Sequence, residues 1–466
     1  MPSPASPARV AVLGGGITGL TAAWELARAG FEPLVFEKSS RVGGAIGAVK
    51  SDGWLHELGP NTLLEGSADV AAFIDAAGLA DRRLYAAPAA KQRYVVRDAR
   101  LVAMPASPAA FLTTPLFSWR AKLGLAGEPW RARGPADHEE SVADFVVRRL
   151  GREFLDYAVN PFVAGVYAGD PAKLSVRHGF PKLHALEQEH GSLLRGALAR
   201  RNASGGPKGR IFSFPNGLAE LPEALARSLG PKALRRRTTV RAVRRTLTGW
   251  EIDCASHDIA WRESCDAVVS TLPADALASL PLENVPAAGA LQALQDIRHP
   301  PVVSVFTGFH RDAVRHPLDG FGVLMPEVER GMILGTLFSS TLFPGRAPEG
   351  HVALTSFVGG MRDPALAALD DSEILRIVQA ELDRLLGVTA PPVFTRVHRW
   401  PRAIPQYTLG YQRFNDAIAT AEASAPGLFI GGNCRDGISL ANCIASGRRL
   451  ASAAAAALTA ARSRPR

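Results

Sequence analysis

The residues with the clearest chemical meaning form a glycine-rich turn near the start of the chain. Gly14, Gly16 and Gly19 have the spacing GxGxxG within VAVLGGGITGL. Between a strand and a helix, such a turn lets a dinucleotide pyrophosphate approach the backbone, and the start of the helix offers it N–H groups. Glu37 follows 18 residues after Gly19, where a carboxylate accepts hydrogen bonds from ribose hydroxyls and repels a 2′-phosphate. The pattern predicts a dinucleotide site.

Two further glycine-rich segments extend this pattern. The first contains the pair Gly43 and Gly44 and the sequence ELGPN at 57–61. A dinucleotide site needs only the first strand, helix and strand, and these additional residues resemble the extended FAD fingerprint of the flavin amine oxidase and desaturase superfamily. The second is GGNCRDGISLANCIASG at 431–447, in which we expect a helix from Asn442 to aim N–H groups at the flavin ring. The resemblance to the extended FAD fingerprint favours FAD over NAD. Because no second well-placed GxGxxG follows, a built-in nicotinamide site is not expected, and the electrons are expected to leave to oxygen or another acceptor.

A third segment, NPFVAGVYAGDPAKLSVR at 160–177, offers no obvious nucleophile, acid pair or metal cluster. We interpret it as a smooth wall against a substrate, where Gly165 and Gly169 let the backbone come close. Val166 and Tyr167 are expected to pack behind this wall. No side chain is expected to be catalytic, and no metal site is expected because the four cysteines lack CxxC and paired histidine spacing.

The elements that must position these segments follow from the hydrophobic pattern. RVAVL at 9–13 predicts a buried strand, 21–29 a helix ending at Gly30, and PLVFE a second strand. The pattern is mostly helical from 68 to 205, and NASGGPKG at 202–209 predicts a flexible connection. Further strands are predicted within 238–254, 265–273, 301–309, 351–360 and 427–434, and further helices at 372–387 and 441–458. The first and last segments are expected to build one domain around an inserted middle.

Composition excludes several classes of protein. The chain has 466 residues, 47% hydrophobic and 21% charged, which predicts two or three globular domains. Its net charge of +9 favours anionic ligands. The densest arginine cluster, within 235–245, has no interleaved aromatic residues, so we do not expect nucleic-acid binding.

The sequence also bears on location. No apolar run of 18 residues is present, so a membrane-spanning helix is not expected. The start of the chain has no signal-peptide pattern, which predicts a cytoplasmic protein. Residues 101–119 carry no charge and contain three prolines, and such a segment is compatible with contact at a membrane interface or with an internal apolar loop.

Taken in order, these segments resemble the protoporphyrinogen oxidase family, oxygen-dependent flavoenzymes of haem biosynthesis. The resemblance covers nearly the whole chain, whereas amine oxidases would share only the first and last segments. It rests on VLGGGITGL, ELGPN, NPFVAGVYAGDPAKLSVR, FPKLHALEQEHGS, GFGVLMP, LGTLFSSTLFPGRAP, FVGG and GNCRDGIS.

The resemblance implies an α/β fold with three domains. A Rossmann-like FAD-binding domain of the p-hydroxybenzoate hydroxylase type would comprise residues 1–70, 206–272 and 422–466. A mixed-sheet substrate domain would comprise 71–92 and 273–421. A helical, membrane-associating insertion would comprise 93–205, and it contains the uncharged segment.

The resemblance also implies site residues. Arg93 would pair with a porphyrin propionate, because a guanidinium can bind a carboxylate bidentately. Gly165 would line the pocket wall, and Asn61 stands where some family members carry arginine. Apolar contacts with the macrocycle are expected from Phe321, Leu324, Leu337 and Phe357. The expected cofactor contacts are Gly14, Gly15, Gly16, Ile17, Thr18, Gly19, Glu37, Lys38, Arg41, Gly43, Gly44, Gly59, Pro60, Asn61, Thr62, Val240, Gly432, Asn433, Ile438, Ser439 and Leu440.

The activity that the resemblance implies is the six-electron oxidation of protoporphyrinogen IX to protoporphyrin IX, with oxygen as acceptor and three molecules of hydrogen peroxide formed. It also implies peripheral attachment to the cytoplasmic side of the inner membrane and leaves room for a homodimer. The alternatives are oxidation of coproporphyrinogen III, an amine oxidase or carotenoid desaturase, and a basic porphyrin carrier without catalysis.

Overall fold

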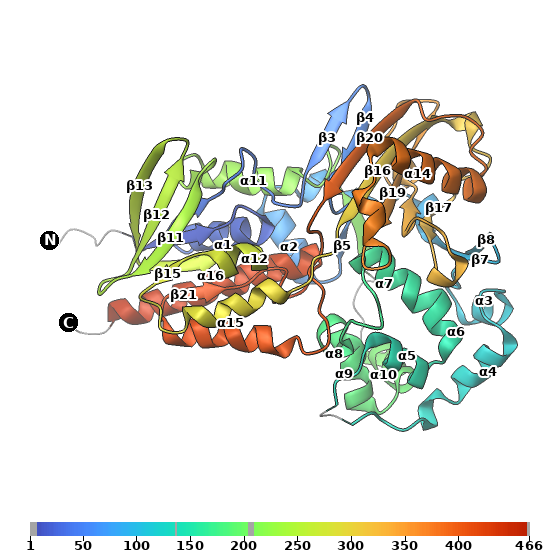
Figure 1. Cartoon of the computed structure of the whole chain (residues 1–466), viewed down its shortest axis with the longest axis horizontal. Coiled ribbons are helices and arrows are strands. Elements are labelled where there is room, and N and C mark those ends of the chain that lie inside the picture. Colours follow the sequence, from blue (N-terminus) through green and yellow to red (C-terminus); the bar gives the residue numbers. More distant parts are fainter. Residues whose placement is uncertain (1–6, 136–137, 204–208, 464–466) are drawn as a thin grey trace.

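The computed structural model describes residues 7–135, 138–203 and 209–463. Figure 1 shows two lobes along the longest axis of the molecule. One lobe is built on a parallel sheet, and the other combines a seven-stranded sheet with a group of short helices. The predicted α/β class, with a Rossmann-like sheet and a second mixed sheet, is confirmed.

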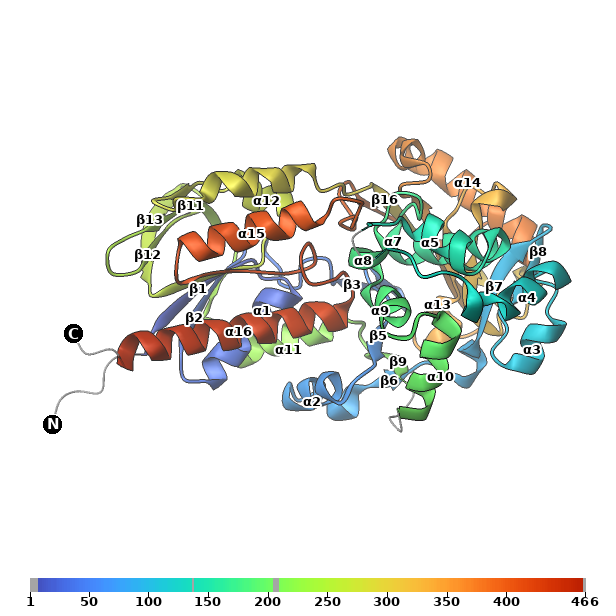
Figure 2. The ribbon, with the colours of Figure 1, turned by 90° about the horizontal axis from the view of Figure 1, so that it is seen from below.

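A five-stranded parallel sheet forms the centre of the first lobe. Its central strands are apolar along almost their whole length, because both faces are covered. On one face, α1 (Ile17–Arg28) packs between α11 (Glu220–Leu229) and α16 (Leu440–Ser463) (Figure 2). The strand order is β10 (Leu234–Arg235), β2 (Glu32–Phe36), β1 (Arg9–Leu13), β14 (Ala267–Ser270) and β21 (Leu428–Ile430).

The other face of the parallel sheet is covered by a smaller sheet and by helices. The helical cover consists of α12 (Ala274–Ser279), the 3-10 helix η5 (Ala288–Asp296) and α15 (Gln412–Ser424). All three contribute to one apolar core with the parallel sheet. The smaller sheet has the order β13 (Ile259–Cys265), β12 (Trp250–Ser256), β11 (Thr239–Arg245) and β15 (Leu282–Glu283).

This core corrects two predicted domain boundaries. Residues 274–297 and 407–421 were assigned to the substrate domain, but their apolar side chains pack in the core of the dinucleotide lobe. The reason is that periodicity shows which face of a helix is apolar, and it does not show which sheet that face will cover. The boundary at 93 is also wrong, as the next sheet shows.

The second lobe contains a seven-stranded sheet, one face of which is covered by α14 (Asp371–Leu386). The sheet includes β7 and β8, which were predicted to belong to the helical insertion. Strands of only six and four residues between loops carry a weak alternation signal. The order is β20 (Phe394–Trp400), β16 (Val302–His310), β19 (His351–Gly359), β18 (Gly335–Leu337), β17 (Gly320–Leu324), β7 (Gln92–Arg97) and β8 (Arg100–Ala103).

Short elements connect the two lobes. A hairpin of β3 (Ala48–Ser51) and β4 (Trp54–Glu57) leads from the dinucleotide lobe to the seven-stranded sheet. β9 pairs with β5 and with β6, which lie far from it in the sequence. The other short elements of the chain outside the helical unit are β5 (Leu63–Glu65), α2 (Ala68–Ala76), the 3-10 helices η1 (Ala80–Arg82) and η2 (Pro88–Lys91), β6 (Leu84–Tyr85), β9 (Arg210–Ser213), and, within the second lobe, η6 (Arg311–Ala313), η7 (Glu327–Glu329), α13 (Ser339–Leu342) and η8 (Pro364–Ala368).

Helices between residues 108 and 203 pack around a core of their own, below the seven-stranded sheet in Figure 1. No helix among the described residues is long and apolar enough to cross a membrane. Part of the predicted connection at 202–209 lies outside the described residues. The elements are α3 (Pro108–Thr113), α4 (Trp119–Ala126), η3 (Glu128–Trp130), α5 (Val142–Arg149), α6 (Arg152–Phe154), the π-helix η4 (Leu155–Val159), α7 (Asn160–Tyr167), α8 (Val176–Gly179), α9 (Pro181–His190) and α10 (Leu193–Ala203).

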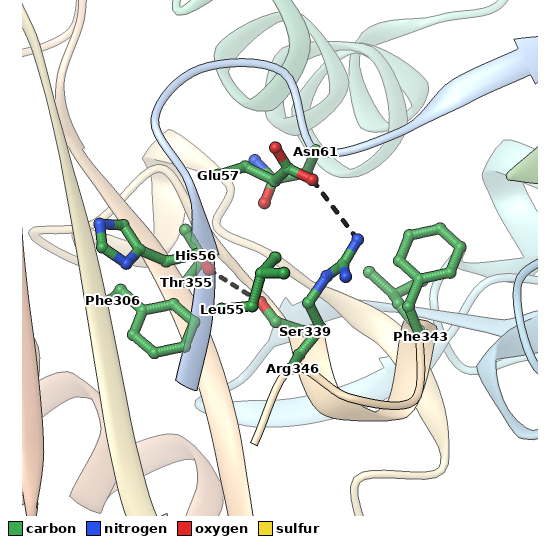
Figure 3. Close-up of a pocket in the computed structure, with 10 residues that line it drawn as sticks. Leu55, His56, Glu57, Asn61, Phe306, Ser339, Phe343, Arg346 and Thr355 are labelled. Carbon is green, nitrogen blue, oxygen red and sulfur yellow. Dashed lines mark hydrogen bonds and ion pairs between the residues drawn. The ribbon is translucent and has the colours of Figure 1, made fainter. Parts of the chain in front are cut away.

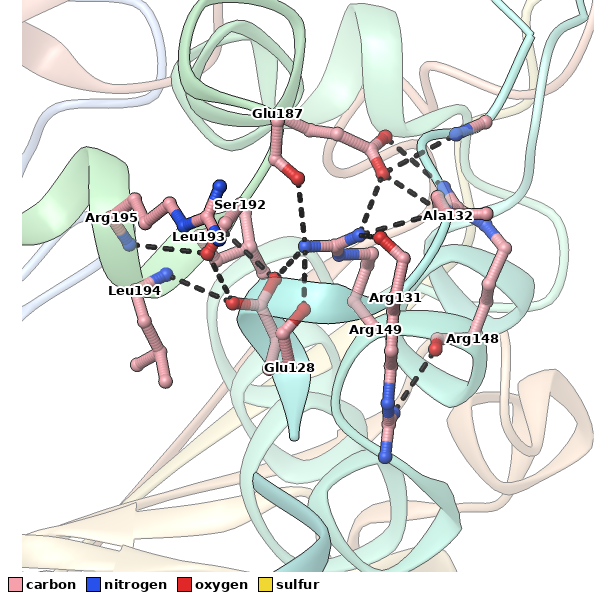
Figure 4. A network of polar contacts seen from close by, with 12 residues as sticks. Glu128, Arg131, Ala132, Arg148, Arg149, Glu187, Ser192, Leu193, Leu194 and Arg195 are labelled. Atoms are coloured by element: carbon pink, nitrogen blue, oxygen red, sulfur yellow. Dashed lines mark hydrogen bonds and ion pairs between the residues drawn. The ribbon is translucent and has the colours of Figure 1, made fainter. Parts of the chain in front are cut away.

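A buried ion pair holds this helical unit together (Figure 4). Glu128 and Arg149 are both fully buried and hydrogen-bonded to each other. The Glu128 carboxylate also accepts the backbone N–H groups of Leu193 and Leu194 at 2.9 and 3.2 Å, at the start of α10. The pair therefore joins η3, α5 and α10 in one polar network.

Candidate active site

The glycine-rich turn has the geometry that a dinucleotide site needs. Gly14 has a φ of +102°, which a residue with a side chain rarely adopts. A Cβ on Gly19 would lie 2.0 Å from the Gly14 carbonyl oxygen, so glycine is required where the helix starts against the strand. A Cβ on Gly16 would meet nothing within 4 Å, so the backbone there faces open space. α1 begins at Ile17, four residues earlier than predicted, and its first N–H groups lie at this turn.

Glu37 stands at the end of β2 and contacts the glycine turn directly. Its Oε2 accepts the Gly15 N–H at 2.9 Å, and its Oε1 accepts the Ser39 N–H at 2.8 Å. Each carboxylate oxygen retains a second lone pair, so hydrogen bonds to ribose hydroxyls remain feasible. The Thr238 N–H bonds to the Glu37 carbonyl oxygen, which brings the strand of Val240 to the same place. Lys38 is exposed beside it.

The second glycine segment folds against the first. Gly43 donates its N–H to the Gly15 carbonyl oxygen at 2.8 Å, and a Cβ on Gly44 would lie 3.3 Å from Gly16 Cα. The guanidinium of Arg41 bonds to the carbonyl oxygens of Gly44 and Ile46, so it holds the loop in shape. The predicted contact of Arg41 with the cofactor stays a prediction.

The C-terminal glycine loop reaches the same edge of the parallel sheet. Gly432 has a φ of +118° and donates its N–H to Asp436 Oδ2 and Ser446 Oγ, both at 3.1 Å. α16 starts at Leu440, two residues before the predicted start. Ser439 and Asn433 are exposed, while Ile438 is partly buried.

Two tyrosines that the sequence analysis missed support this loop. The Tyr407 hydroxyl donates to the Asn433 carbonyl oxygen at 2.6 Å and accepts the Gly437 N–H at 2.8 Å. The Tyr411 hydroxyl donates to the Cys434 carbonyl oxygen at 2.6 Å. Burial raises the pKa of both tyrosines, so they remain protonated donors. The only sequence signal was a pair of aromatic residues four positions apart.

These contacts fit FAD. The open backbone at Gly16, the helix start at Ile17 and the Glu37 carboxylate form one surface with Gly43 and Gly44. The Thr271 hydroxyl at the end of β14 bonds back to the Leu13 carbonyl oxygen and fixes the strand ends. Dinucleotides bind at such carboxyl ends of parallel strands.

A sheet face next to this surface collects the predicted substrate residues. Leu324 is paired with Gly335, which is paired in turn with Phe357, so Leu324 and Phe357 share a face. Leu337 lies two residues from Gly335 and therefore on that same face. α14 covers the opposite face, through residues such as Val323. Leu324, Leu337 and Phe357 are partly buried, and α7 lies against part of the face that they share. We call this shared face the open sheet face.

The remaining predicted substrate residues lie around the open sheet face. The Arg93 guanidinium carbon lies 5.3 Å from the centre of the Phe321 ring, and Arg93 is exposed. A Cβ on Gly165 would lie 2.4 Å from Leu324 Cδ2, so the α7 backbone contacts this leucine. Asn61 lines a small cavity with Ser339 and other residues (Figure 3), and its Nδ2 donates to the Gly59 carbonyl oxygen.

Comparisons with known proteins decide the family. The family model of flavin-containing amine oxidoreductases matches residues 17–455. Protoporphyrinogen oxidase 2, chloroplastic/mitochondrial, of Arabidopsis thaliana is 34% identical over 95% of this chain and 93% of its own. The chain belongs to the flavin-containing amine oxidoreductase family.

Two further proteins, one compared by sequence and one by structure, are similar to this chain over nearly its whole length. Coproporphyrinogen III oxidase of Bacillus subtilis (strain 168) is 29% identical over 94% of this chain and 96% of its own. A solved structure from Exiguobacterium sp. 255-15 has a TM-score of 0.81 at 24% identity, covering 96% of this chain and 99% of that chain. The resemblance to protoporphyrinogen oxidases inferred from the sequence is confirmed, and this family member is an oxidoreductase with FAD as its cofactor.

The structure contradicts part of the interpretation of the 160–177 segment. Gly169 is buried, and a Cβ there would meet Gln406 Oε1 at 2.7 Å, so it packs against protein and not against a ligand. Val166 is 44% exposed and does not pack behind the wall. Tyr167 does pack, against Phe180. The segment forms a helix, which turns these residues to different sides, whereas the interpretation treated it as one surface.

Other groups in the described residues lack the pattern of a catalytic or metal centre. No cluster of three or more His, Cys, Asp and Glu within the described ranges could hold a metal ion. The four cysteines are buried and unpaired with one another, and burial raises the pKa of Cys434 to about 12. A buried thiol of that kind is a poor nucleophile.

Proposed function

We propose that this protein oxidises protoporphyrinogen IX to protoporphyrin IX, with FAD as the electron acceptor and oxygen as the terminal oxidant. The observation that carries the proposal is the open sheet face, which is apolar and has an exposed guanidinium, Arg93, at its edge. A flat macrocycle with carboxylate side chains matches such a surface. Relatives named protoporphyrinogen oxidase, such as the Arabidopsis protein, support it.

The protein's part in this reaction is to hold the substrate beside the flavin. Trp400 Nε1 donates to the Leu58 carbonyl oxygen at 2.8 Å, which fixes the ELGPN segment to the seven-stranded sheet. This hydrogen bond joins the segment beside the dinucleotide surface to the sheet that carries the open sheet face. Bound FAD supplies the redox chemistry, and the side chains supply orientation and electrostatics. Arg93 would pair with a propionate, and Leu324 and Phe357 would contact the ring.

A porphyrinogen assay tests this proposal. Purified protein with bound FAD should convert anaerobically prepared protoporphyrinogen into a fluorescent product in air. Parallel rates with coproporphyrinogen III decide the second candidate, which the Bacillus subtilis relative supports. Protein that binds flavin but oxidises neither porphyrinogen contradicts the proposal, and peroxide release with amines would then favour an amine oxidase. Desaturation of a lipid polyene would favour a carotenoid desaturase, and absence of a flavin spectrum would favour a carrier.

The role of Arg93 can be tested separately. Arg93→Ala should raise KM for the porphyrinogen about tenfold, because a charge-assisted pair contributes about 1.5–3 kcal/mol. FAD occupancy should not change. Arg100→Ala, an exposed arginine on the neighbouring strand, is the matched control and should leave KM as it is. Loss of flavin in the Arg93 variant would show a structural role.

We also propose that the helical unit binds a membrane surface on the cytoplasmic side of the inner membrane. Leu112, Trp119, Leu123 and Trp130, on or beside α3 and α4, are 54 to 79% exposed. Exposed apolar side chains of this size mark interaction surfaces. A homodimer remains a prediction.

Vesicle flotation tests membrane binding. The wild-type protein should float with vesicles that contain anionic lipid, and Trp119→Ser combined with Leu123→Ser should reduce the bound fraction. Leu247→Ser removes a fully exposed leucine in the other lobe and should have no effect. Equal binding of all three proteins would contradict the proposed surface.

A further inference from the structure

Glu57, at the end of β4, is a buried carboxylate between the two lobes. It is 4% exposed, and its Oε1 accepts the Leu218 N–H at 2.9 Å. Arg346 Nη2 lies 3.4 Å from the same oxygen and donates to Ser213 Oγ at 2.8 Å. Figure 3 shows this pair from close by.

The second carboxylate oxygen of Glu57 is free to accept a proton. No protein donor in the described residues bonds to Oε2, although this atom is buried. Glu57 lines a cavity of about 10 Å³ together with Asn61, Ser339 and Thr355. That volume accommodates about one water molecule, so a single hydrogen-bonded link to Oε2 is feasible.

The cavity lies at the open sheet face. Thr355 is paired with Leu337 in the sheet, so both side chains point to this face. Phe343, which also lines the cavity, packs in one apolar cluster with Leu337 and Phe321. The cavity therefore adjoins the residues proposed to contact the macrocycle.

Among the titratable groups that line the cavity, Glu57 is the one suited to accept a proton near neutral pH. Burial raises the pKa of the Glu57 carboxyl to about 7, although Arg346 and the Leu218 N–H act to lower it. His56 lines the same cavity, but burial and Arg396 lower its pKa to about 4, so it stays neutral and binds protons weakly. The negative charge of Glu220, on α11, acts to raise the pKa of Arg346. A group that titrates near neutral pH can both accept and release a proton there.

We propose that Glu57 accepts, through the cavity, the proton that each two-electron step of the proposed porphyrinogen oxidation releases. The inference rests on that proposed function. In each step a bridging CH₂ group loses a hydride, which reaches oxygen by way of the cofactor, and one proton passes to Glu57 Oε2. Over the three steps, two of these protons come from pyrrole nitrogens and one comes from the remaining bridging CH₂ group. Hydride, proton and oxygen together give one hydrogen peroxide, so atoms and electrons balance. Because Glu57 acts through the cavity and not by touching the substrate, it is a positioning residue.

Glu57→Gln tests the inference by two measurements. In anaerobic single-turnover reactions with protoporphyrinogen, the rate of flavin bleaching in the wild-type protein should show an inflection near pH 7. The variant should lose this inflection and be slower by about 100-fold at pH 8, the scale of general base catalysis. Infrared spectra of the FAD-loaded protein without substrate should show a protonated carboxyl band that titrates near pH 7 and is absent in Glu57→Gln.

Controls separate the outcomes. Glu381→Gln changes another buried carboxylate, on α14, and should keep both the pH inflection and the infrared band. If Glu57→Gln does not retain flavin, Glu57→Asp should keep an infrared band at a shifted pH and bleach more slowly than wild type. An unchanged pH profile in Glu57→Gln, or no carboxyl band titrating near pH 7 in the wild-type protein, overturns the inference. Wild-type protein that oxidises no porphyrinogen while keeping the infrared band overturns the proposed function instead.

Discussion

Replacing Glu128 by Gln should destabilise the helical unit strongly. Glu128 and Arg149 are both fully buried, and the substitution leaves the guanidinium only its longer contact with Glu187, at 3.5 Å. Breaking a buried pair in this way costs about 3–5 kcal/mol. The amide also has one acceptor oxygen in place of two, while Leu193 and Leu194 both donate N–H groups to this carboxylate.

The size of the effect depends on how the chain unfolds. With an unfolding entropy of about 2.1 cal/mol/K per residue, a chain of 466 residues that unfolds as one unit would lose roughly 3–5 °C of Tm. If the helical unit of about 100 residues unfolds separately, its own transition would fall by roughly 14–24 °C. Calorimetry with far-UV circular dichroism distinguishes the two cases. Flavin absorbance at 20 °C should not change.

A matched control and the pH dependence complete this test. Arg152→Gln breaks an exposed pair with Asp156 in the same unit and should cost less than about 1 kcal/mol.

Burial alone would raise the pKa of Glu128, but the hydrogen bonds from Ser192, Leu193 and Arg149 lower it below its usual range. The stabilisation is therefore complete above the unfolded pKa of about 4.3 and is lost as the pH falls through the folded value. Equal melting of wild type and Glu128→Gln at pH 7 would refute this reasoning.

Three further substitutions test the site. Gly19→Ala places a Cβ 2.0 Å from the Gly14 carbonyl oxygen and should weaken FAD binding by at least about tenfold, measured by fluorescence titration, whereas Gly289→Ala, with open space around it, should not. Gly165→Ala overpacks the leucine it faces at 2.4 Å, at a cost of about 1–3 kcal/mol, and should raise KM for porphyrinogen while leaving the flavin spectrum intact. Tyr407→Phe removes a hydroxyl with two backbone partners and should lower the free energy of unfolding by about 1–3 kcal/mol in urea titrations.

Much of the dinucleotide site could be predicted because its signals are local. A pyrophosphate-binding turn needs glycines at fixed spacing, and parallel strands covered on both faces are apolar throughout. The turn at Gly14 and the acid at Glu37 could therefore be predicted from short segments. Their structures depend on few distant residues.

The parts that could not be predicted depend on tertiary contacts. The Tyr407 hydroxyl donates to the carbonyl oxygen of Asn433, 26 residues away, and no local sequence pattern predicts such a hydrogen bond. Glu57 and Arg346 meet across 289 positions, so neither was a candidate. The hydrogen bonds of Arg41 to neighbouring carbonyls were likewise not predicted from the sequence.

The discontinuous parallel sheet also sets the order in which the protein can be completed during synthesis. β14 ends at residue 270, and its outer partner β21 begins at residue 428. At translation rates of about 5–20 residues per second, the ribosome needs roughly 10–30 s to make the missing strand. During that time the nascent chain carries an unpaired strand edge, which is prone to aggregation. Because the last glycine loop and α16 follow β21 in the chain, the flavin site is complete only after these segments have been made.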